Sequence, residues 1–288
     1  MKNATVNPPF KWTGGKNRMR DKYRPIFFPN GDVKVFVDMF CGACSISLWI
    51  AENYPDCKII LNDANKELVE LYRVFKEEYE PFEQHYEKNV ADYLLLNDYE
   101  ERKKFYNGLL REYCFNYEQH PTWVNAANLF FMMRVNFNGI WKNYIKWNRR
   151  YSTPPGTLTQ KKSFFNIQDV RDFKKFLDRC ELHCQDFGAL TQWQQEGTYY
   201  YADPPYRDSI VEYKDAFSEQ DQIRLADFLK DVDQKGCWFS ESNKEIGDGF
   251  WETHFNDARF KKNYMTAKYT AGRGKSVLDV KEVLVTNF

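Results

Sequence analysis

The order of apolar runs and polar turns divides the chain into an α/β start, a helical middle and an α/β end. Apolar runs at 34–40 and 57–61 predict strands, and a helical pattern at 45–54 between them completes a β-α-β unit. A charged, aromatic and helical stretch follows, with no further β-α-β signal. We expect helices at 66–117, 121–135, 170–179 and 218–232, the last with Ser218 as its N-cap, and strands at 181–187, 198–201, 236–240 and 281–287.

These patterns predict an α/β protein built on a Rossmann-like sheet, with a mainly helical segment inserted into it. We expect one domain to comprise residues 1–65 and 164–288, and the inserted domain to comprise residues 66–163. Inside the insertion, Asn138-Gly139 is a dipeptide typical of a tight β-hairpin turn, and the predicted arms are aromatic and basic through Arg150.

The predicted strand 198–201 runs into Asp203-Pro204-Pro205-Tyr206. The two prolines end the strand because neither has an N–H to donate, so Asp203 and Tyr206 lie at the carboxyl end of a strand, where open α/β sheets bind ligands. The four residues resemble the catalytic motif of the amino-methyltransferases, which methylate the exocyclic amine of adenine or cytosine. In that chemistry the Asp203 carboxylate and the Pro204 carbonyl can hold the amine hydrogens, and Tyr206 offers a flat face to an extruded base.

The first β-α-β unit has the arrangement that binds a nucleoside in Rossmann-like sheets. Gly42 lies in the turn after the first strand, and Asp63 follows about 20 residues later, where an acid accepts ribose hydroxyls. The alternative is that Asp63 is the N-cap of the helix that begins near Lys66. NAD is not favoured because the three-glycine fingerprint is absent. A triphosphate loop is not supported, because Tyr269 stands where the Gly-Arg-Gly-Lys-Ser stretch would need a glycine.

Cysteine usage and hydropathy predict a cytoplasmic protein. The seven cysteines are an odd number without a regular framework, which favours reduced thiols, and no apolar run is long enough to cross a membrane. Cys41 and Cys44 form a Cys-x-x-Cys pair, but we expect turn residues rather than a redox centre. We predict no metal site, because strand alternation separates the remaining candidates Cys180, His183 and Cys184. We expect a monomer or weak dimer without an obligate protein partner.

The chain has no net charge, with 41 basic and 41 acidic residues, but the charges are unevenly distributed. Residues 119–168 and 258–278 contain no Asp or Glu. These windows indicate a localised footprint for a polyanion, and the alternative is two solvated basic faces. In the first window we expect the hairpin tip to read bases in a major groove through Asn138, Gly139, Ile140 and Lys142. We expect phosphate contacts from Lys146, Arg149, Arg150, Lys161 and Lys162.

Five motifs together resemble those of the DNA adenine methylase (Dam) family, over nearly the whole chain. They are Lys11-Trp12-Thr13-Gly14-Gly15-Lys16, Asp38-Met39-Phe40-Cys41-Gly42-Ala43-Cys44-Ser45, Asn62-Asp63, Phe137-Asn138-Gly139 and Asp203-Pro204-Pro205-Tyr206. The resemblance implies a methyltransferase sheet with an inserted target-recognition domain. It also implies transfer of a methyl group from S-adenosyl-L-methionine to N6 of a flipped adenine in double-stranded DNA. The cofactor contacts that it implies are Trp12, Lys16, Asp38, Phe40, Gly42, Asp63 and Asp203, and Lys11 would face DNA.

The chain departs from the family pattern at several positions. Cys44 replaces the second glycine of the cofactor turn, and Met39 replaces a proline. Lys142 stands where the family often has an arginine that reads guanine, so its usual target GATC is a default expectation. The segments 207–209 and 270–273 resemble phage-borne members.

Alternatives for the activity remain open at this point. The chain could be a non-catalytic nucleic-acid-binding protein on a methyltransferase fold, or it could methylate RNA or a protein amino group. The biological role of a DNA methyltransferase is also open, since it could serve restriction-modification, phage protection or regulation.

Overall fold

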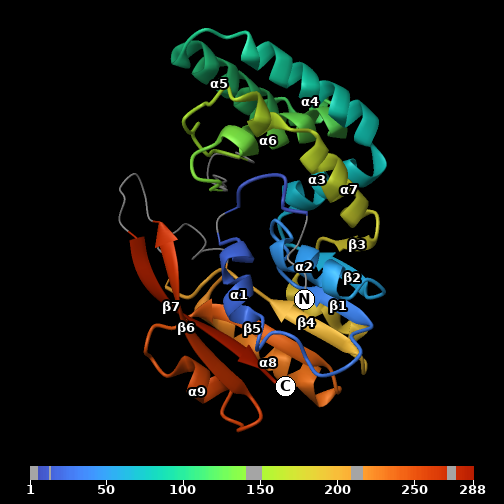
Figure 1. Ribbon diagram of the computed structural model, residues 1–288, viewed down its shortest axis with the longest axis vertical. Coiled ribbons are helices and arrows are strands. Elements are labelled where there is room, and N and C mark those ends of the chain that lie inside the picture. Colours follow the sequence, from blue (N-terminus) through green and yellow to red (C-terminus); the bar gives the residue numbers. More distant parts are fainter. Residues whose placement is uncertain (1–5, 13, 141–150, 209–216, 271–276) are drawn as a thin grey trace. The chain divides into compact units, whose positions relative to one another are not determined.

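The computed structural model describes residues 6–12, 14–140, 151–208, 217–270 and 277–288 (Figure 1). The chain divides into two compact units, and each is assembled from segments that are distant in sequence. Unit 1 comprises 1–15, 42–48 and 65–182, and unit 2 comprises 16–41, 49–64 and 183–288. Residues 66–163, which the sequence predicts to be an inserted domain, lie wholly within unit 1, together with further segments.

Seven strands form one mixed sheet in the described part of the chain, which confirms the predicted α/β class. They are β1 (Val35–Asp38), β2 (Lys58–Asn62), β3 (Cys180–His183), β4 (Thr198–Ala202), β5 (Trp238–Lys244), β6 (Lys261–Thr270) and β7 (Val277–Thr286). Their order is β3-β2-β1-β4-β5-β7-β6. Strand β1 pairs in parallel with β2 and β4, and β4 pairs in parallel with β5, whereas β7 is antiparallel to both β5 and β6.

The central strand β4 is buried on both faces, as parallel strands in the middle of a sheet are. Tyr199 and Tyr201 face one side, where their rings lie 5.5 and 5.3 Å from the ring of Phe27. Tyr200 faces the other side and donates its hydroxyl to the Leu190 carbonyl at 2.8 Å. Because three aromatic side chains hold it from both faces, β4 gives a rigid base for the residues that follow it.

Unit 2 covers its sheet with short helices and one long one. They are η1 (Lys16–Met19), α1 (Arg20–Tyr23), η5 (Phe187–Trp193), α8 (Glu219–Gln234) and α9 (Phe250–His254), and α2 (Ser45–Asn53) has its second half in this unit. Helix α8 begins with the predicted N-cap: Ser218 and Asp221 form a reciprocal capping box. Its buried face packs on the sheet beside β4 and β5 (Figure 1).

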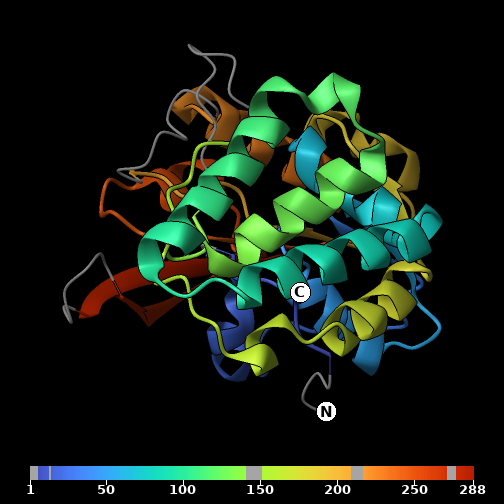
Figure 2. The same cartoon turned by 90° about the horizontal axis from the view of Figure 1, so that it is seen from above.

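Unit 1 is helical and is organised around α6 (Thr122–Val135). Its other helices are η2 (Tyr117–Gln119), α3 (Lys66–Glu77), α4 (Tyr79–Leu94), α5 (Tyr99–Phe115), η4 (Lys162–Phe165) and α7 (Gln168–Leu177). Figure 2 looks onto this group, drawn mainly in teal, green and yellow-green. Helix α6 is apolar around nearly its whole circumference, which is typical of a helix that others surround. Its buried Asn128 accepts hydrogen bonds from Asn89 at 2.9 Å and pairs with His85.

Several element boundaries differ from the sequence prediction for local physical reasons. The strand predicted at 181–187 ends at His183, because the Asp186 side chain accepts a hydrogen bond from the Gly188 N–H and begins η5. Strand β5 continues to Lys244 through a polar run that gives no apolar signal. Strand β6 and helix α9 are additional to the predicted elements. No helix within the described ranges is long and apolar enough to cross a membrane.

Candidate active site

Asp203 follows β4 directly and is paired with Lys16 from η1. The Lys16 ammonium lies 2.7 Å from each carboxylate oxygen, and the Ser242 hydroxyl on β5 donates to the same carboxylate at 2.9 Å. Lys16 is almost fully buried, whereas 18% of the Asp203 side chain is exposed. The carboxylate is thus fixed in position by two donors and still reaches the surface of unit 2.

The environment changes the acidity of Asp203. Burial raises the pKa of the Asp203 carboxyl above its ordinary value, while the Lys16 ammonium and the Ser242 hydroxyl oppose this rise. The buried Glu282 carboxylate adds to the rise in pKa. The position of Asp203 therefore combines a firmly held carboxylate with a greater tendency to take up a proton than an exposed aspartate has.

Tyr206 lies beside this pair and is held at two points. The Lys16 ammonium lies over its ring, 4.7 Å from the centroid, which is a cation–π distance. Its hydroxyl donates to Glu282 on β7 at 2.9 Å. The hydroxyl of the buried Tyr23 donates to the other oxygen of Glu282 at 3.3 Å.

The backbone of the Asp-Pro-Pro-Tyr turn is held by amide side chains below it. The Gln222 side chain of α8 donates to the Pro205 carbonyl at 2.8 Å, and Asn243 of β5 donates to Gln222 at 3.0 Å. The Asn243 side-chain oxygen in turn accepts from the Arg207 N–H at 3.1 Å. This chain of hydrogen bonds fixes both ends of the segment 205–207 to the sheet and to α8.

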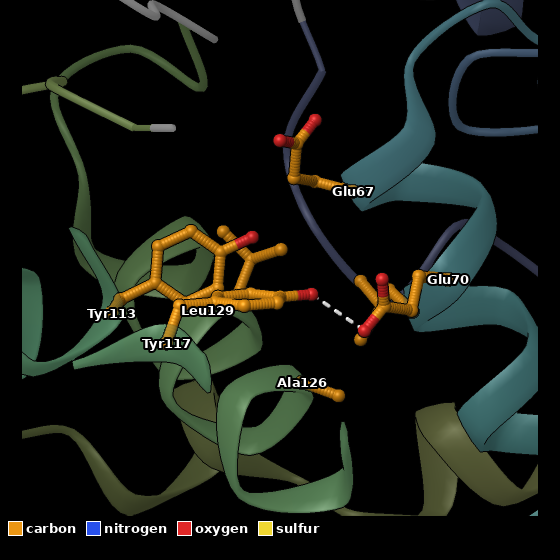
Figure 3. Close-up of a pocket in the computed structure, with 7 residues that line it drawn as sticks. Glu67, Glu70, Tyr113, Tyr117, Ala126 and Leu129 are labelled. Atoms are coloured by element: carbon orange, nitrogen blue, oxygen red, sulfur yellow. Dashed lines mark hydrogen bonds between the residues drawn. The ribbon is translucent and has the colours of Figure 1, made fainter. Parts of the chain in front are cut away.

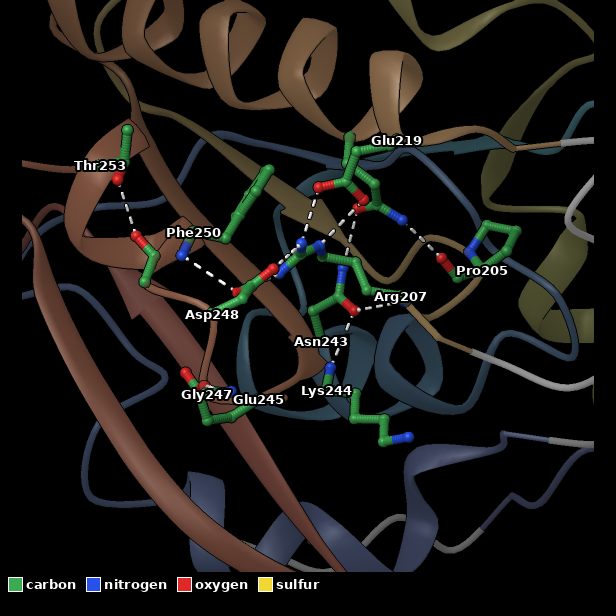
Figure 4. Close-up of polar contacts among 12 residues, drawn as sticks. Pro205, Arg207, Glu219, Asn243, Lys244, Glu245, Gly247, Asp248, Phe250 and Thr253 are labelled. Atoms are coloured by element: carbon green, nitrogen blue, oxygen red, sulfur yellow. Dashed lines mark hydrogen bonds and ion pairs between the residues drawn. The ribbon is translucent and has the colours of Figure 1, made fainter.

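Arg207, the residue directly after the turn, is held in place by its own buried guanidinium (Figure 4). It forms ion pairs with Glu219 in the first turn of α8 and with Asp248 before α9, and it lies over the Phe250 ring at 4.0 Å. These two carboxylates raise the pKa of Arg207 despite its burial, so the side chain stays charged. The residue that follows the Asp-Pro-Pro-Tyr motif is thereby tied to two helices.

Glu241 is a second buried acid, two residues before Asn243 and therefore on the same face of β5. It is fully buried, and neither carboxylate oxygen has a hydrogen-bond partner among the residues that the structure describes. Burial raises the pKa of Glu241 to about 8. Burial therefore favours the protonated form of this side chain well above the pH at which an exposed glutamate ionises.

The carboxyl ends of β1 and β2 carry the residues predicted to bind a nucleoside. Asp38 is the last residue of β1 and is buried, and Phe40 packs against Phe187 with ring centroids 5.7 Å apart. Asp63 follows β2 and is partly exposed. Its alternative role as a helix N-cap is wrong: the side chain of Asn65, not Asp63, accepts the Leu68 N–H at 3.1 Å and caps α3. Three acids, Asp38, Asp63 and Asp203, thus end or follow three adjacent parallel strands.

Trp12 and Gly42, two further predicted cofactor residues, meet within unit 1. Gly42 has a φ of +45°, and a side chain there would clash with the Trp12 indole, since an added Cβ would lie 2.7 Å from its nitrogen. The Tyr72 hydroxyl also donates to the Gly42 carbonyl. Cys44, which replaces the family's second glycine, keeps the left-handed backbone with a φ of 59°. The turn therefore retains a glycine-type shape without the second glycine.

The predicted Asn138-Gly139 turn is present. Both residues have positive φ, and the Ile140 N–H donates to the Phe137 carbonyl at 3.2 Å, as in a type I′ turn. Asn138 is exposed, whereas Gly139 packs so closely on Lys11 that an added Cβ would lie 2.7 Å from the Lys11 Cβ. The structure thus brings together two segments that the sequence links to DNA.

The predicted phosphate contacts are only partly within the described residues. Lys142, Lys146, Arg149 and Arg150 lie outside them. Lys161 and Lys162 are described and exposed at the start of η4. Arg134 from the same basic window is a structural residue: its guanidinium donates to the Pro9 and Phe164 carbonyls, and its burial lowers its pKa. In the second window, Arg259 is paired with Asp233 at 3.1 Å.

Other candidate centres carry no site. A shallow pocket of unit 1 lies between α3, α5 and α6, where Tyr117 donates to Glu70 (Figure 3). It contains none of the predicted site residues. The seven cysteines all lie within the described ranges, and none of them is joined to another in a disulfide. Among the residues that the structure describes, no group of three or more His, Cys, Asp and Glu side chains could hold a metal ion.

Two residues that hold Asp203 and Tyr206 from the sheet, Ser242 and Glu282, were not predicted from the sequence. Ser242 lies in a polar run that resembles a loop, and Glu282 has the sequence context of a strand residue facing solvent. The one available signal was strand alternation: in β7, Glu282 shares its face with the buried Leu284.

Comparison with known proteins supports one family. Residues 12–272 match the model of the D12 class N6 adenine-specific DNA methyltransferases. The type II methyltransferase M.MjaIII of Methanocaldococcus jannaschii is 26% identical over 85% of this chain and 86% of its own length. The type II methyltransferase M1.LlaDCHI of Lactococcus lactis subsp. cremoris is 26% identical, over 98% of this chain and 96% of its own length. The DNA adenine methylase of Haemophilus influenzae is 25% identical over 88% of this chain and 85% of its own length.

Proposed function

Because the chain belongs to the D12 class N6 adenine-specific DNA methyltransferases, we propose that it uses S-adenosyl-L-methionine to methylate a flipped adenine in double-stranded DNA. The observation that carries the proposal is Asp203, held at the carboxyl end of β4 by Lys16 and Ser242. A non-catalytic role on this fold is not favoured, because the family is catalytic and the Asp-Pro-Pro-Tyr motif is complete.

We propose the following roles in the reaction. The Asp203 carboxylate and the Pro204 carbonyl accept the two N6 hydrogens and direct the nitrogen lone pair away from the ring. A bond forms between N6 and the methyl carbon while the bond from that carbon to sulfur breaks, and N6 then loses one proton to solvent. The Tyr206 ring stacks on the flipped base. S-adenosyl-L-methionine supplies the methyl group on a positively charged sulfur when it is bound.

The residues at the ends of β1 and β2 fit a nucleoside cofactor. Asp63 is partly exposed at the end of its strand, where a carboxylate can accept ribose hydroxyls, and Phe40 offers an aromatic side chain after β1. Asp38 completes this set in unit 2. In unit 1, Trp12 approaches Gly42 so closely that only a glycine can occupy that position. Contact of these two residues with the cofactor stays a prediction.

We propose that residues 66–163 act as the target-recognition domain. The type I′ turn at Asn138-Gly139, with Ile140 beside it, presents an exposed asparagine next to Lys11, and asparagine can read adenine in a major groove. Lys161 and Lys162 are exposed cations that can contact phosphates.

Mapping 6-methyladenine in plasmid DNA from a host that expresses the protein tests the function and gives the recognition sequence. We expect methylation at one short motif with the wild-type protein and none with Asp203→Asn, which keeps the shape of the side chain and removes its charge. Calorimetry with S-adenosyl-L-methionine on both proteins separates loss of cofactor binding from loss of chemistry. Methylated DNA from the Asp203→Asn host would refute the assigned role of Asp203. Unmethylated DNA with the folded wild-type protein would refute the function.

A further inference from the structure

Glu282 is a fully buried acid inside strand β7. In the sheet register it pairs with Lys244 on β5 and with Met265 on β6, so it lies between two strands, one strand in from the edge strand β6. Burial of a carboxylate in such a place costs free energy unless polar groups compensate it. An apolar residue would satisfy the packing of the strand, so the acid calls for a specific reason.

The compensation comes from tyrosine hydroxyls, one of which belongs to the candidate catalytic motif. Tyr206 donates to one oxygen of Glu282 at 2.9 Å, and the buried Tyr23 donates to the other at 3.3 Å. The hydrogen bond to Glu282 restrains the outer end of the Tyr206 side chain, because its acceptor is fixed inside the sheet.

Tyr206 is therefore held at three places. The backbone directly after it is fixed, because the Arg207 N–H donates to the Asn243 side chain at 3.1 Å. Its hydroxyl is fixed by Glu282. One face of the ring carries the Lys16 ammonium, 4.7 Å from the centroid. With that face occupied, a base can stack only on the opposite face.

We propose that Glu282 is a positioning residue for methyl transfer: it holds the Tyr206 hydroxyl and so fixes the orientation in which the ring meets the base. This inference rests on the proposed function for its catalytic consequence, but the restraint on the ring does not. Glu282 acts through Tyr206 and does not touch the reacting atoms. It differs in this from Asp203, which contacts the amine in the proposed reaction.

Two variants and their combination test this. Tyr206→Phe keeps the ring and removes the hydroxyl, and Glu282→Gln keeps the shape and removes the charge. We expect each to lower kcat/KM for DNA by roughly tenfold, and the double variant to be within about twofold of the weaker single one, because both remove the same restraint. Tyr199→Phe is the matched control: it removes another buried tyrosine hydroxyl, bonded to Ser240 and to the Phe27 carbonyl. We expect it to keep the wild-type kcat/KM.

A second measurement needs neither DNA nor cofactor. In protein labelled with 3-fluorotyrosine, the ¹⁹F resonance of Tyr206 is identified by its loss in Tyr206→Phe. A ring held at its hydroxyl gives resolved signals for its two orientations, and we expect these to merge or shift in Glu282→Gln and to remain in Tyr199→Phe.

The two readouts keep the two proposals distinguishable. Multiplicative losses in the double variant, or an unchanged Tyr206 resonance in Glu282→Gln, would overturn the positioning role. If the wild-type protein failed to methylate DNA while the resonance still responded to Glu282→Gln, the restraint would stand and the proposed function would fall.

Discussion

The Lys16 ammonium lies 2.7 Å from both carboxylate oxygens of Asp203, although 187 residues separate the two in sequence. The pair joins the helical turn that precedes the sheet to the end of its central strand. Lys16 also lies over the ring of Tyr206, so one cation contacts both Asp203 and Tyr206 of the Asp-Pro-Pro-Tyr turn.

The first prediction concerns the pH dependence of the reaction. Only the ionised Asp203 accepts a hydrogen bond through both oxygens, so kcat/KM falls as the pH falls through its pKa. Burial places that pKa above the ordinary aspartate value, and Lys16 limits the rise. Lys16→Met should move the acid limb of the kcat/KM profile to higher pH, whatever it does to the maximal rate. A profile measured from pH 5 to 9 that keeps the same acid limb in Lys16→Met would contradict this.

The second prediction separates cofactor binding from helix capping. Asp63→Ala should weaken S-adenosyl-L-methionine binding by about 1–3 kcal/mol, the scale of a lost charge-assisted hydrogen bond, and leave thermal stability nearly unchanged. Asn65→Ala, two residues on, is the matched control. It removes the N-cap of α3 and should cost about 1 kcal/mol of stability with unchanged affinity. Calorimetry and thermal unfolding of both variants decide it. Equal cofactor affinity in Asp63→Ala and wild type would remove Asp63 from the cofactor site.

The third prediction concerns stability and Glu241, whose pKa burial raises to about 8. The folded protein binds the proton of Glu241 more tightly than the unfolded chain does, so proton binding stabilises the fold at low pH. This stabilisation is lost as the pH rises from about 4.5 to 8. The stability of Glu241→Gln relative to wild type should increase by on the order of 1 kcal/mol per pH unit over that window.

Urea unfolding at pH 5, 6.5 and 8 measures this difference. Glu196→Gln makes the same substitution at an exposed position and serves as the control. A constant difference for Glu241→Gln would show that the buried acid titrates normally.

The fourth prediction concerns DNA. Lys161→Ala removes an exposed cation and should weaken binding to all duplexes equally, with the salt slope lowered by about one unit. Lys142→Ala, in the predicted hairpin, should instead change which sequences are methylated, by roughly 1–3 kcal/mol per misread base pair. Methylation mapping of randomised duplexes at two salt concentrations compares them. A uniform loss of activity on every sequence in Lys142→Ala would mean that this lysine contacts phosphates and does not read bases.

The fold was predictable where local pattern and burial agree. Strands β1, β2 and β4 are apolar and continuous, and the Ser218 cap and the Asn138-Gly139 turn have local chemistry that specifies them. The prediction failed where burial opposes composition. Ser240, Ser242 and Asn243 are polar but buried, and their side chains bond to other side chains from distant segments.

The same distinction applies to the candidate site. Asp203 and Tyr206 are recognisable from a local motif, since the prolines between them fix their position after the strand. Glu282 is not, because its role depends on the register of β7 against β5, which no local pattern gives. The pairing of Lys16 with Asp203 was likewise beyond sequence reasoning, although both residues were predicted separately.

The sheet order has a consequence for the newly made chain. Strand β1 has β2 as one neighbour and β4 as the other. Roughly 160 residues separate β1 from β4, so at about 5–20 residues per second the ribosome takes roughly 10–30 s to supply the second neighbour. Throughout that interval an apolar edge that includes Phe36 and Val37 is open to other chains, as unprotected strand edges are. The edge of β1 is therefore covered on both sides only after β4 has been synthesised.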